Sequence, residues 1–315
     1  MIRFPSVVIL FWLLLSTAAL ADHGKGAVGG KTISPRTLHE EDASIETGFR
    51  YQRSETFSDD RLLNAAADGH DAHSVDWLAE FSVAGAYGVT DHLTLSVSLP
   101  FEVIHGFRFV ENDGVNPPAV EGANSIVGMG DATMIGKVSV AADPVELAVL
   151  LGVKIPTGST GQLDNAGNLL EPDHQPGTGS WDPLIGVAAL HQFEAFSLGG
   201  SMLFRYTTEG RHEFQPGEQL TIATKGEVQV AGLGKFPRVY LNLELAYQWT
   251  AMDREDHLRN HDTGGTSVTL GPGVRVRVND HVSLGASFSF PLYQGLYGFQ
   301  HKERFEFLFG TGVDF

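Results

Sequence analysis

The carboxy-terminal stretch, Lys302 to Phe315, alternates strictly between two kinds of residue. Phe305, Phe307 and Phe309 fall on one parity with Thr311, Val313 and Phe315, whereas the other parity carries Glu306, Leu308, Gly310, Gly312 and Asp314. Successive side chains of a β-strand point to opposite faces, so this pattern predicts a strand with one aromatic face and one small or acidic face.

The same alternation runs through the chain from about residue 45 and predicts about twelve strands. Each apolar row is long enough for the roughly 9–11 tilted residues that cross a bilayer. The expected connections alternate in length, with short turns near 88–91, 141–145, 192–195, 233–237 and 279–280, and long loops near 55–74, 106–126, 157–180, 208–218, 250–265 and 292–301. Short turns on one side and long loops on the other are typical of outer-membrane barrels.

Charged side chains fall almost entirely on the parity opposite to the apolar rows. In a transmembrane barrel that parity lines the lumen, while the apolar rows and the aromatic residues at the strand ends face lipid and the interfaces. We therefore predict an all-β fold, a transmembrane antiparallel β-barrel over residues 42–315. A secreted all-β protein is the alternative. The expected lumen-lining residues are Glu80, Glu102, Asp131, Lys137, Lys154, Asp182, Arg205, Lys225, Glu227, Glu244, Arg275, Arg277 and Glu306.

The two ends of the chain indicate export. Residues 1–21 read as a cleaved signal peptide, with Arg3, an apolar run from Phe4 to Leu15, and Ala19-Leu20-Ala21 as the cleavage site. The final strand resembles the closing strand of bacterial outer-membrane barrels, in which a terminal aromatic residue, here Phe315, is the signal for the insertion machinery. It should pair with the strand from Ser44 to Ser54, because an open edge in a bilayer leaves backbone groups unsatisfied. We expect the protein in the outer membrane of a Gram-negative bacterium.

Residues 22–41 are rich in glycine and charge and have no period. They predict a flexible amino-terminal arm that could plug the barrel. A barrel of twelve strands lies between the filled eight-stranded kind and the open porins of 16–18 strands. We therefore expect a narrow lumen, obstructed by side chains or by this arm.

Composition limits the partners. The formal net charge is −17 and the chain contains no cysteine. Nucleic acid is therefore an unexpected partner, and thiolate chemistry and disulfides are excluded. The acidic loops should disfavour anionic solutes near the mouth and attract the divalent cations that bridge lipopolysaccharide. The expected partners are membrane lipid and lipopolysaccharide, the insertion machinery and a small-molecule solute.

Three motifs carry a family resemblance: Gly128 to Lys137 (GMGDATMIGK), Gly152 to Gly158 (GVKIPTG) and Pro176 to Pro183 (PGTGSWDP). With them the sequence resembles the outer-membrane family named for the MetA-pathway of phenol degradation, from about residue 75 to the end. The resemblance implies a barrel that moves hydrophobic or aromatic compounds. The motifs place Asp131, Lys137, Lys154 and Asp182 on neighbouring strands, where they could form a charge ladder. Such a ladder would either buttress the barrel or line a permeation path.

The long loops hold most of the 13 histidines. His70, Asp71 and His73 are the candidate metal ligands, because imidazole and carboxylate groups bind zinc, copper or nickel. Other loop positions of this type are His105, His174, His212, His257, His261, Asp262 and His301. The alternative is that these histidines are solvated loop residues.

An enzyme is not expected. His281 and Ser283 could suggest a hydrolase, but they follow the short turn at Asn279-Asp280 and lie on the periplasmic side of the predicted barrel. No cofactor is predicted. The sequence therefore favours an outer-membrane channel or transporter for small, hydrophobic or aromatic molecules. A barrel without transport activity, which displays its loops or captures metal with its His/Asp-rich loops, is the alternative.

Overall fold

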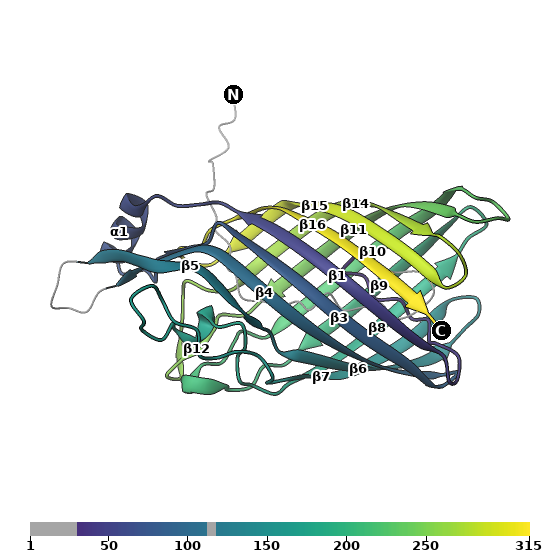
Figure 1. Ribbon diagram of the computed structural model, residues 1–315, viewed down its shortest axis with the longest axis horizontal. Coiled ribbons are helices and arrows are strands. Elements are labelled where there is room, and N and C mark those ends of the chain that lie inside the picture. Colours follow the sequence, from purple (N-terminus) through teal and green to yellow (C-terminus); the bar gives the residue numbers. More distant parts are fainter. Residues whose placement is uncertain (1–29, 112–117) are drawn as a thin grey trace, which may run out of the picture.

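A computed structural model describes residues 30–111 and 118–315. The signal peptide predicted over 1–21 and the first part of the arm lie outside these residues. In the described part, twelve antiparallel strands form a closed barrel, which confirms the predicted fold (Figure 1). In order around the ring they are β1 (Ala43–Ser54), β3 (Trp77–Thr90), β4 (Leu93–Glu111), β6 (Ala132–Ala141), β7 (Glu146–Ile155), β8 (Asp182–Gln192), β9 (Phe196–Arg205), β10 (Gln219–Ala231), β11 (Arg238–Thr250), β14 (Gly265–Arg277), β15 (Val282–Leu296) and β16 (Glu303–Asp314).

The barrel closes between its first and last strands. β1 pairs with β16 in antiparallel register, with Thr47 opposite Thr311 and Phe49 opposite Phe309. This pairing confirms the predicted seam. The backbone N–H of Phe315 donates to the carbonyl of Ala43 at 2.8 Å, so the chain end is held at the start of β1 while the ring of Phe315 stays exposed.

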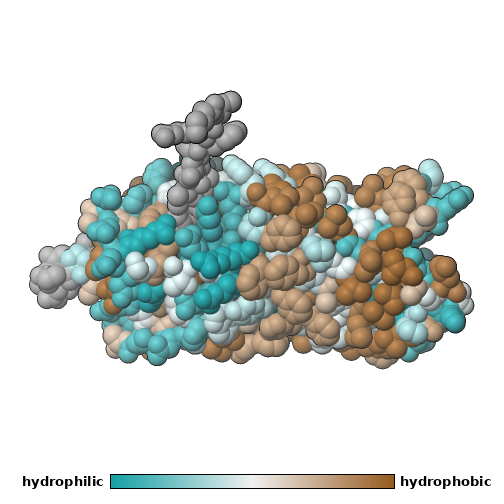
Figure 2. Space-filling view, turned by 90° about the horizontal axis from the view of Figure 1, so that it is seen from above, coloured by the Kyte–Doolittle hydropathy of each residue, from teal (hydrophilic) through white to brown (hydrophobic). Residues whose placement is uncertain are grey.

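The two parities of the strands face different surroundings. On β3, Phe81 and Val83 are 52% and 55% exposed. Glu80, on the same strand, is 1% exposed. Figure 2 shows apolar side chains gathered over the part built from strands and hydrophilic ones over the end that carries the loops. Only a closed sheet can cross lipid without unsatisfied edges. A closed barrel with an apolar outer band places the protein in the outer membrane, as the sequence predicts.

The two ends of the barrel differ. The connections at 91–92, 142–145, 193–195, 232–237 and 278–281 are short and lie at the end that holds the carboxy terminus (Figure 1). By the outer-membrane arrangement this end is periplasmic. The other end carries long connections, including 55–76, 156–181, 206–218, 251–264 and 297–302.

One long loop differs from its prediction. The expected loop over 106–126 is wrong in extent, because β4 continues to Glu111 and β5 (Ala119–Met129) pairs with it from Phe101 onward. β6 then pairs with the first part of β4, so β5 and β6 are one strand interrupted at Gly130 and Asp131. Gly106 has a positive φ of 70° and interrupts the register, which hid the strand from a parity reading.

The loop end has a small core of its own. Helix α1 (Asp59–Ala67) lies within the first long loop, and Ser58 caps it by accepting a hydrogen bond from Arg61. Its buried Leu62 packs with Phe57, Ala65 and Ala72. Shorter elements complete this end: β2 (His73–Ser74), η1 (Pro172–His174), η2 (Arg211–Glu213), β12 (Arg254–Glu255) and β13 (Leu258–Arg259). Among the described residues, no helix is long and apolar enough to cross a membrane.

Candidate functional site: the barrel lumen

The amino-terminal arm enters the lumen and bonds to a carboxylate on the barrel wall. The backbone N–H groups of Lys31 and Thr32 donate to Glu244 on β11, both at 2.8 Å, and the Thr32 hydroxyl donates to the same carboxylate at 2.7 Å. Nζ of Lys31 lies 3.0 Å from Oε1 of Glu306 on β16. Glu244 and Glu306, both predicted to face the lumen, therefore hold the arm from two strands.

The next residue of the arm fills an apolar part of the lumen. Ile33 is 5% exposed, and its backbone N–H donates to Oγ of Ser201 on β9 at 3.0 Å. Its neighbours in this buried cluster come from β6, β7, β8 and β9: Ile135, Leu150, Leu184, Ala188 and Leu203. The charged parity of the strands thus contains an apolar socket, which the charge pattern did not reveal.

Nearer the periplasm the arm is fixed by ion pairing. The guanidinium of Arg36 bonds both oxygens of Glu146 on β7, with Nε–Oε2 and Nη2–Oε1 each 2.8 Å. Lys137 donates from Nζ to the carbonyl of Arg36 at 2.8 Å, and Thr94 accepts from the backbone of Leu38 at 2.8 Å. Bidentate pairs of this kind are among the stronger hydrogen bonds in proteins. The arm is therefore anchored at two heights of the lumen.

A buried lysine connects residues from all three sequence motifs. Nζ of Lys154 lies 2.7 Å from Asp131 and 2.9 Å from Asp182, and all three residues are almost fully buried. Asp131 also accepts hydrogen bonds from the backbone of Gly158 and Thr178, at 2.9 and 3.0 Å. The cluster therefore ties the connection 156–181 to the wall. Three of the four predicted ladder residues meet here; Lys137 instead bonds the arm.

A second buried charge cluster lies on the first and last strands. Nη2 of Arg50 on β1 is 2.7 Å from Glu80, and its Nη1 is 3.8 Å from Glu306. Glu102 on β4 is buried beside them. Arg50 shares the inward parity but was not among the predicted lumen residues; its position opposite Glu80 in the β1–β3 register identifies it.

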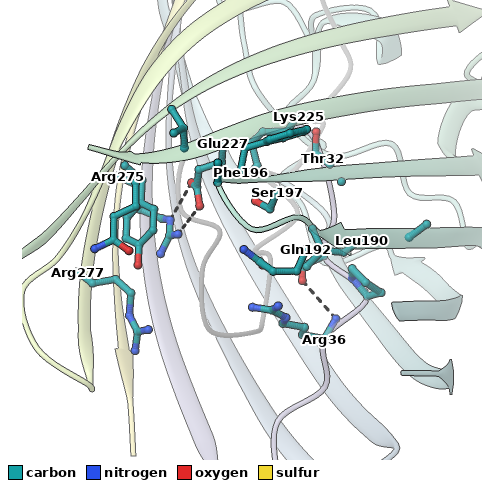
Figure 3. A pocket seen from close by; sticks show the side chains of 18 of the residues that line it. Thr32, Arg36, Leu190, Gln192, Phe196, Ser197, Lys225, Glu227, Arg275 and Arg277 are labelled. Atoms are coloured by element: carbon teal, nitrogen blue, oxygen red, sulfur yellow. Dashed lines mark hydrogen bonds and ion pairs between the residues drawn. The ribbon is translucent and has the colours of Figure 1, made fainter. Parts of the chain in front are cut away.

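The arm leaves a cavity of about 490 Å³ on the periplasmic side. Figure 3 shows Arg36, Lys225, Arg275 and Arg277 among the residues that line it, together with Phe196 and Leu190. Arg275 pairs with Glu227, with Nε–Oε2 at 3.0 Å, and lies over the ring of Tyr240. Cationic side chains therefore outnumber carboxylates around this cavity, although the chain as a whole is acidic.

Comparison with solved structures finds the same architecture. The chain is similar to a crystal structure of an outer membrane channel from Pseudomonas putida F1, at 14% identity and a TM-score of 0.61, covering 89% of this chain and 97% of that one. The chain is a β-barrel of the outer-membrane type. Other similar structures are the KdgM porin (6% identity, TM-score 0.43, 86% and 99% covered) and the β domain of the Bordetella autotransporter BrkA (10% identity, TM-score 0.48, 88% and 100% covered).

No family model and no curated protein match the chain. The resemblance to the phenol-degradation family therefore stays a prediction.

The remaining predicted lumen residues all lie on strands of this barrel. Arg205 on β9 is buried, whereas Lys225, Glu227 and Arg277 are partly exposed to the cavity. All of the predicted residues lie within these strands, except that Asp131 lies at the interruption between β5 and β6.

The three residues predicted as metal ligands do not form a single group. Nδ1 of His70 lies 2.8 Å from Oδ1 of Asp262, and Asn260 donates to Asp71 at 2.8 Å. His73 is buried, and its ring centre is 4.9 Å from that of His174. His73 stays near Asp71, with Nδ1 4.0 Å from Oδ1, and also belongs to a second set of residues drawn from other loops.

Not all loop histidines are solvated. His212, His257 and His261 are exposed, as a solvated loop requires. His73, His174 and His301 are buried, so the solvated interpretation is wrong for these three. Their burial depends on packing between loops that are far apart in sequence, which local pattern does not reveal.

The residues considered for hydrolysis lie at the periplasmic rim. Nδ1 of His281 is 3.0 Å from the carbonyl oxygen of Asp314, and its backbone N–H donates to Asn279. Ser283 lies opposite Gly312 in the β15–β16 register. His281 therefore contacts the closing strand through backbone atoms and stabilises the turn.

Proposed function

We propose that the protein is an outer-membrane channel for small solutes, closed by residues 30–41 of its own arm. The observation that carries this proposal is the set of bonds from Lys31, Thr32, Ile33 and Arg36 to four different strands across the lumen. Each of these bonds, the bidentate Arg36–Glu146 pair included, exchanges with water when the arm leaves, so its net contribution is smaller than its strength in the absence of water. An arm held in this way closes the lumen and can still be displaced.

The cavity supports a solute class. Its wall combines Phe196, Leu190 and Tyr240 with Lys225 and Arg277. Apolar walls with a few placed charges are typical of small-molecule sites. We therefore propose small aromatic or hydrophobic molecules that carry a negative charge, such as aromatic carboxylates, as the solutes. This cationic cavity lies further into the barrel than the acidic loops. The loops should disfavour anionic solutes at the mouth, whereas the cavity favours them.

The proposal includes the expected partners of such a barrel. Lipid contacts the apolar outer band, lipopolysaccharide lies around the acidic loop end, and the insertion machinery recognises the exposed Phe315. A solute passes by diffusion down its gradient and needs no cofactor.

Uptake tests the function directly. Proteoliposomes that contain the purified barrel should admit labelled benzoate faster than protein-free liposomes do, and deletion of the gene should slow benzoate uptake by cells. A barrel that gives neither conductance nor uptake would contradict the channel and favour loop display.

Charge reversal in the cavity should change ion selectivity. In the double variant Lys225→Glu/Arg277→Glu, the open channel should shift its preference from anions toward cations, because two cationic side chains beside the path become anionic. The reversal potential in a potassium chloride gradient measures this shift. The matched control is Arg259→Glu, an exposed residue of the β12–β13 hairpin, which should leave the reversal potential unchanged. Equal reversal potentials in all three proteins would show that the cavity is not on the path.

A further inference from the structure

Three histidine rings from three separate loops lie close together at the loop end of the barrel. His73 lies in β2, His174 ends η1 in the connection 156–181, and His301 lies in the connection before β16. The ring of His73 is 4.9 Å from that of His174 and 5.8 Å from that of His301, measured between centres. Their exposed fractions are 2%, 5% and 0%. Such burial of three polar rings requires a physical reason.

Several polar atoms in this cluster have no hydrogen-bond partner within the described part of the chain. Nε2 of His174 and both ring nitrogens of His301 have no hydrogen-bond partner among the described residues. The same holds for Oδ2 of Asp173, which is 1% exposed. Each buried polar atom without a partner destabilises the fold, because it has lost its hydrogen bonds to water. A bound ligand that gives these atoms a partner would remove this destabilisation.

Carboxylates complete the set. Oδ1 of Asp173 lies 2.6 Å from Nδ1 of His174, and Oε2 of Glu171 lies 3.9 Å from the same nitrogen. Ligand atoms of Glu171, Asp173 and His174 all lie within 4.8 Å of one another. His73 and His301 are outside this group, so their rings must rotate to bring a nitrogen to it. Asp71 is close by, with Oδ1 4.0 Å from Nδ1 of His73.

Burial and nearby charges shift the pKa values of several groups in the cluster. Burial, with the charge of Asp71 added, raises the pKa of Asp173 to about 8. Burial and the charge of Asp173 likewise raise the pKa of Glu255 to about 8. Burial lowers the pKa of His174 to about 3, and burial with the charges of His73 and His174 lowers the pKa of His301 well below its usual range. His73 differs, because the hydrogen bond and the charge of Asp71 outweigh burial and raise its pKa. A metal ion would have to displace this proton, since imidazole coordinates a metal in its neutral form.

We propose that Asp173, His174, His73 and His301 bind one divalent transition-metal ion of the zinc type, which joins three extracellular loops. Two imidazoles that share a tetrahedral zinc ion through bonds of about 2.0–2.1 Å have ring centres about 5 Å apart, close to the spacings here. Imidazole with one carboxylate is a donor set for zinc, nickel, cobalt or copper. Calcium and magnesium bind oxygen ligands and do not match it.

The surroundings suit such a site. The ring of Phe107 is 4.3 Å from that of His174, and the ring of Phe57 is 6.3 Å from that of His301. A hydrophobic shell of this kind excludes water and controls access to a metal. Rotation of the imidazoles about their side-chain torsions is the adjustment that we expect on binding. The ion would hold β2, η1 and the segment before β16 together, and this proposal stands whether or not the barrel conducts.

Metal binding by the purified, folded full chain tests the proposal. After treatment with a chelator, the protein should bind one Zn²⁺ per chain, measured by calorimetry and by elemental analysis of the dialysed protein. Co²⁺ should give the strong visible absorption of a tetrahedral site with nitrogen ligands. In the double variant His174→Asn/His301→Asn, affinity for Zn²⁺ should fall at least about 100-fold, since even loss of outer-shell partners costs 10–100-fold.

The control separates this site from the other histidines. The double variant His212→Asn/His257→Asn removes two exposed histidines at the same end of the barrel and should bind Zn²⁺ as the wild type does. Asp173→Asn, which changes no ring, should also weaken binding and serves if the double histidine variant fails to fold. Folding of every variant is checked by heat-modifiable migration on gels. Wild-type affinity in His174→Asn/His301→Asn, or a six-coordinate Co²⁺ spectrum in the wild type, would overturn the proposal.

Discussion

Replacing Lys154 by methionine lowers the free energy of unfolding of the barrel by about 3–5 kcal/mol. The ammonium group lies 2.7 Å from Asp131 and 2.9 Å from Asp182, with side-chain exposures of 3%, 1% and 0%. Its removal leaves two buried carboxylates without the cation that contacts both of them. Equilibrium unfolding in guanidinium chloride, followed by tryptophan fluorescence of the refolded barrel in detergent, measures the loss.

Two further variants assign the effect to the charge cluster. Lys235→Met, in the exposed turn between β10 and β11, removes the same charge and should change the free energy of unfolding by less than about 0.5 kcal/mol. Adding Asp131→Asn and Asp182→Asn to Lys154→Met should recover most of the lost stability, because neutral amides need no cation. A Lys154→Met barrel as stable as the wild type would show that the cluster contributes nothing to stability.

Removing residues 22–36 raises the single-channel conductance several-fold. The deletion removes Ile33 from its apolar socket and Arg36 from Glu146, so the lumen loses the segment that fills it. Planar bilayer recordings of the purified barrel in potassium chloride measure the conductance. Thr37 and Leu38 remain, with their bonds to Asp91 and Thr94, so that the start of β1 keeps its anchor.

A point variant distinguishes displacement of the arm from a change in the barrel wall. Glu244→Gln weakens the acceptor of four hydrogen bonds from Lys31 and Thr32 but leaves the arm in the chain. It should make open events more frequent and leave their amplitude near that of the deletion. If the deletion conducts no better than the intact protein, the arm does not close the lumen.

The strands and their inward face could be predicted from the sequence, because a local pattern encodes both. Alternation of apolar and polar residues gave the twelve strands, and the charge on one parity gave the inward face. The terminal strand predicted its own partner, because only pairing with β1 removes the open edge. These features depend on the two-residue period of a strand, which any short window of sequence shows.

Contacts between distant segments could not be predicted in the same way. Ile33 finds its socket only after β6, β7, β8 and β9 have been placed around the lumen. More than a hundred residues separate His73 from His301, and His174 lies between them in the sequence. The residues beside each histidine do not indicate that it is buried. The length of β4 and β5 was missed because Gly106 interrupts the parity while the pairing continues on both sides of it.

The central claim is that the arm closes the channel from within the lumen and opens it by leaving. The chain has no cysteine, so an engineered pair of cysteines can form only one disulfide within the chain. Ile33 and Ser201 suit this purpose, because the backbone nitrogen of Ile33 lies 3.0 Å from Oγ of Ser201. In the variant Ile33→Cys/Ser201→Cys, single-channel recordings under oxidising conditions should lack the open level, and a reductant should restore it to at least the wild-type frequency, because the variant also weakens the anchor at Ile33. Equal opening in the oxidised, cross-linked barrel and in the reduced barrel would contradict the account.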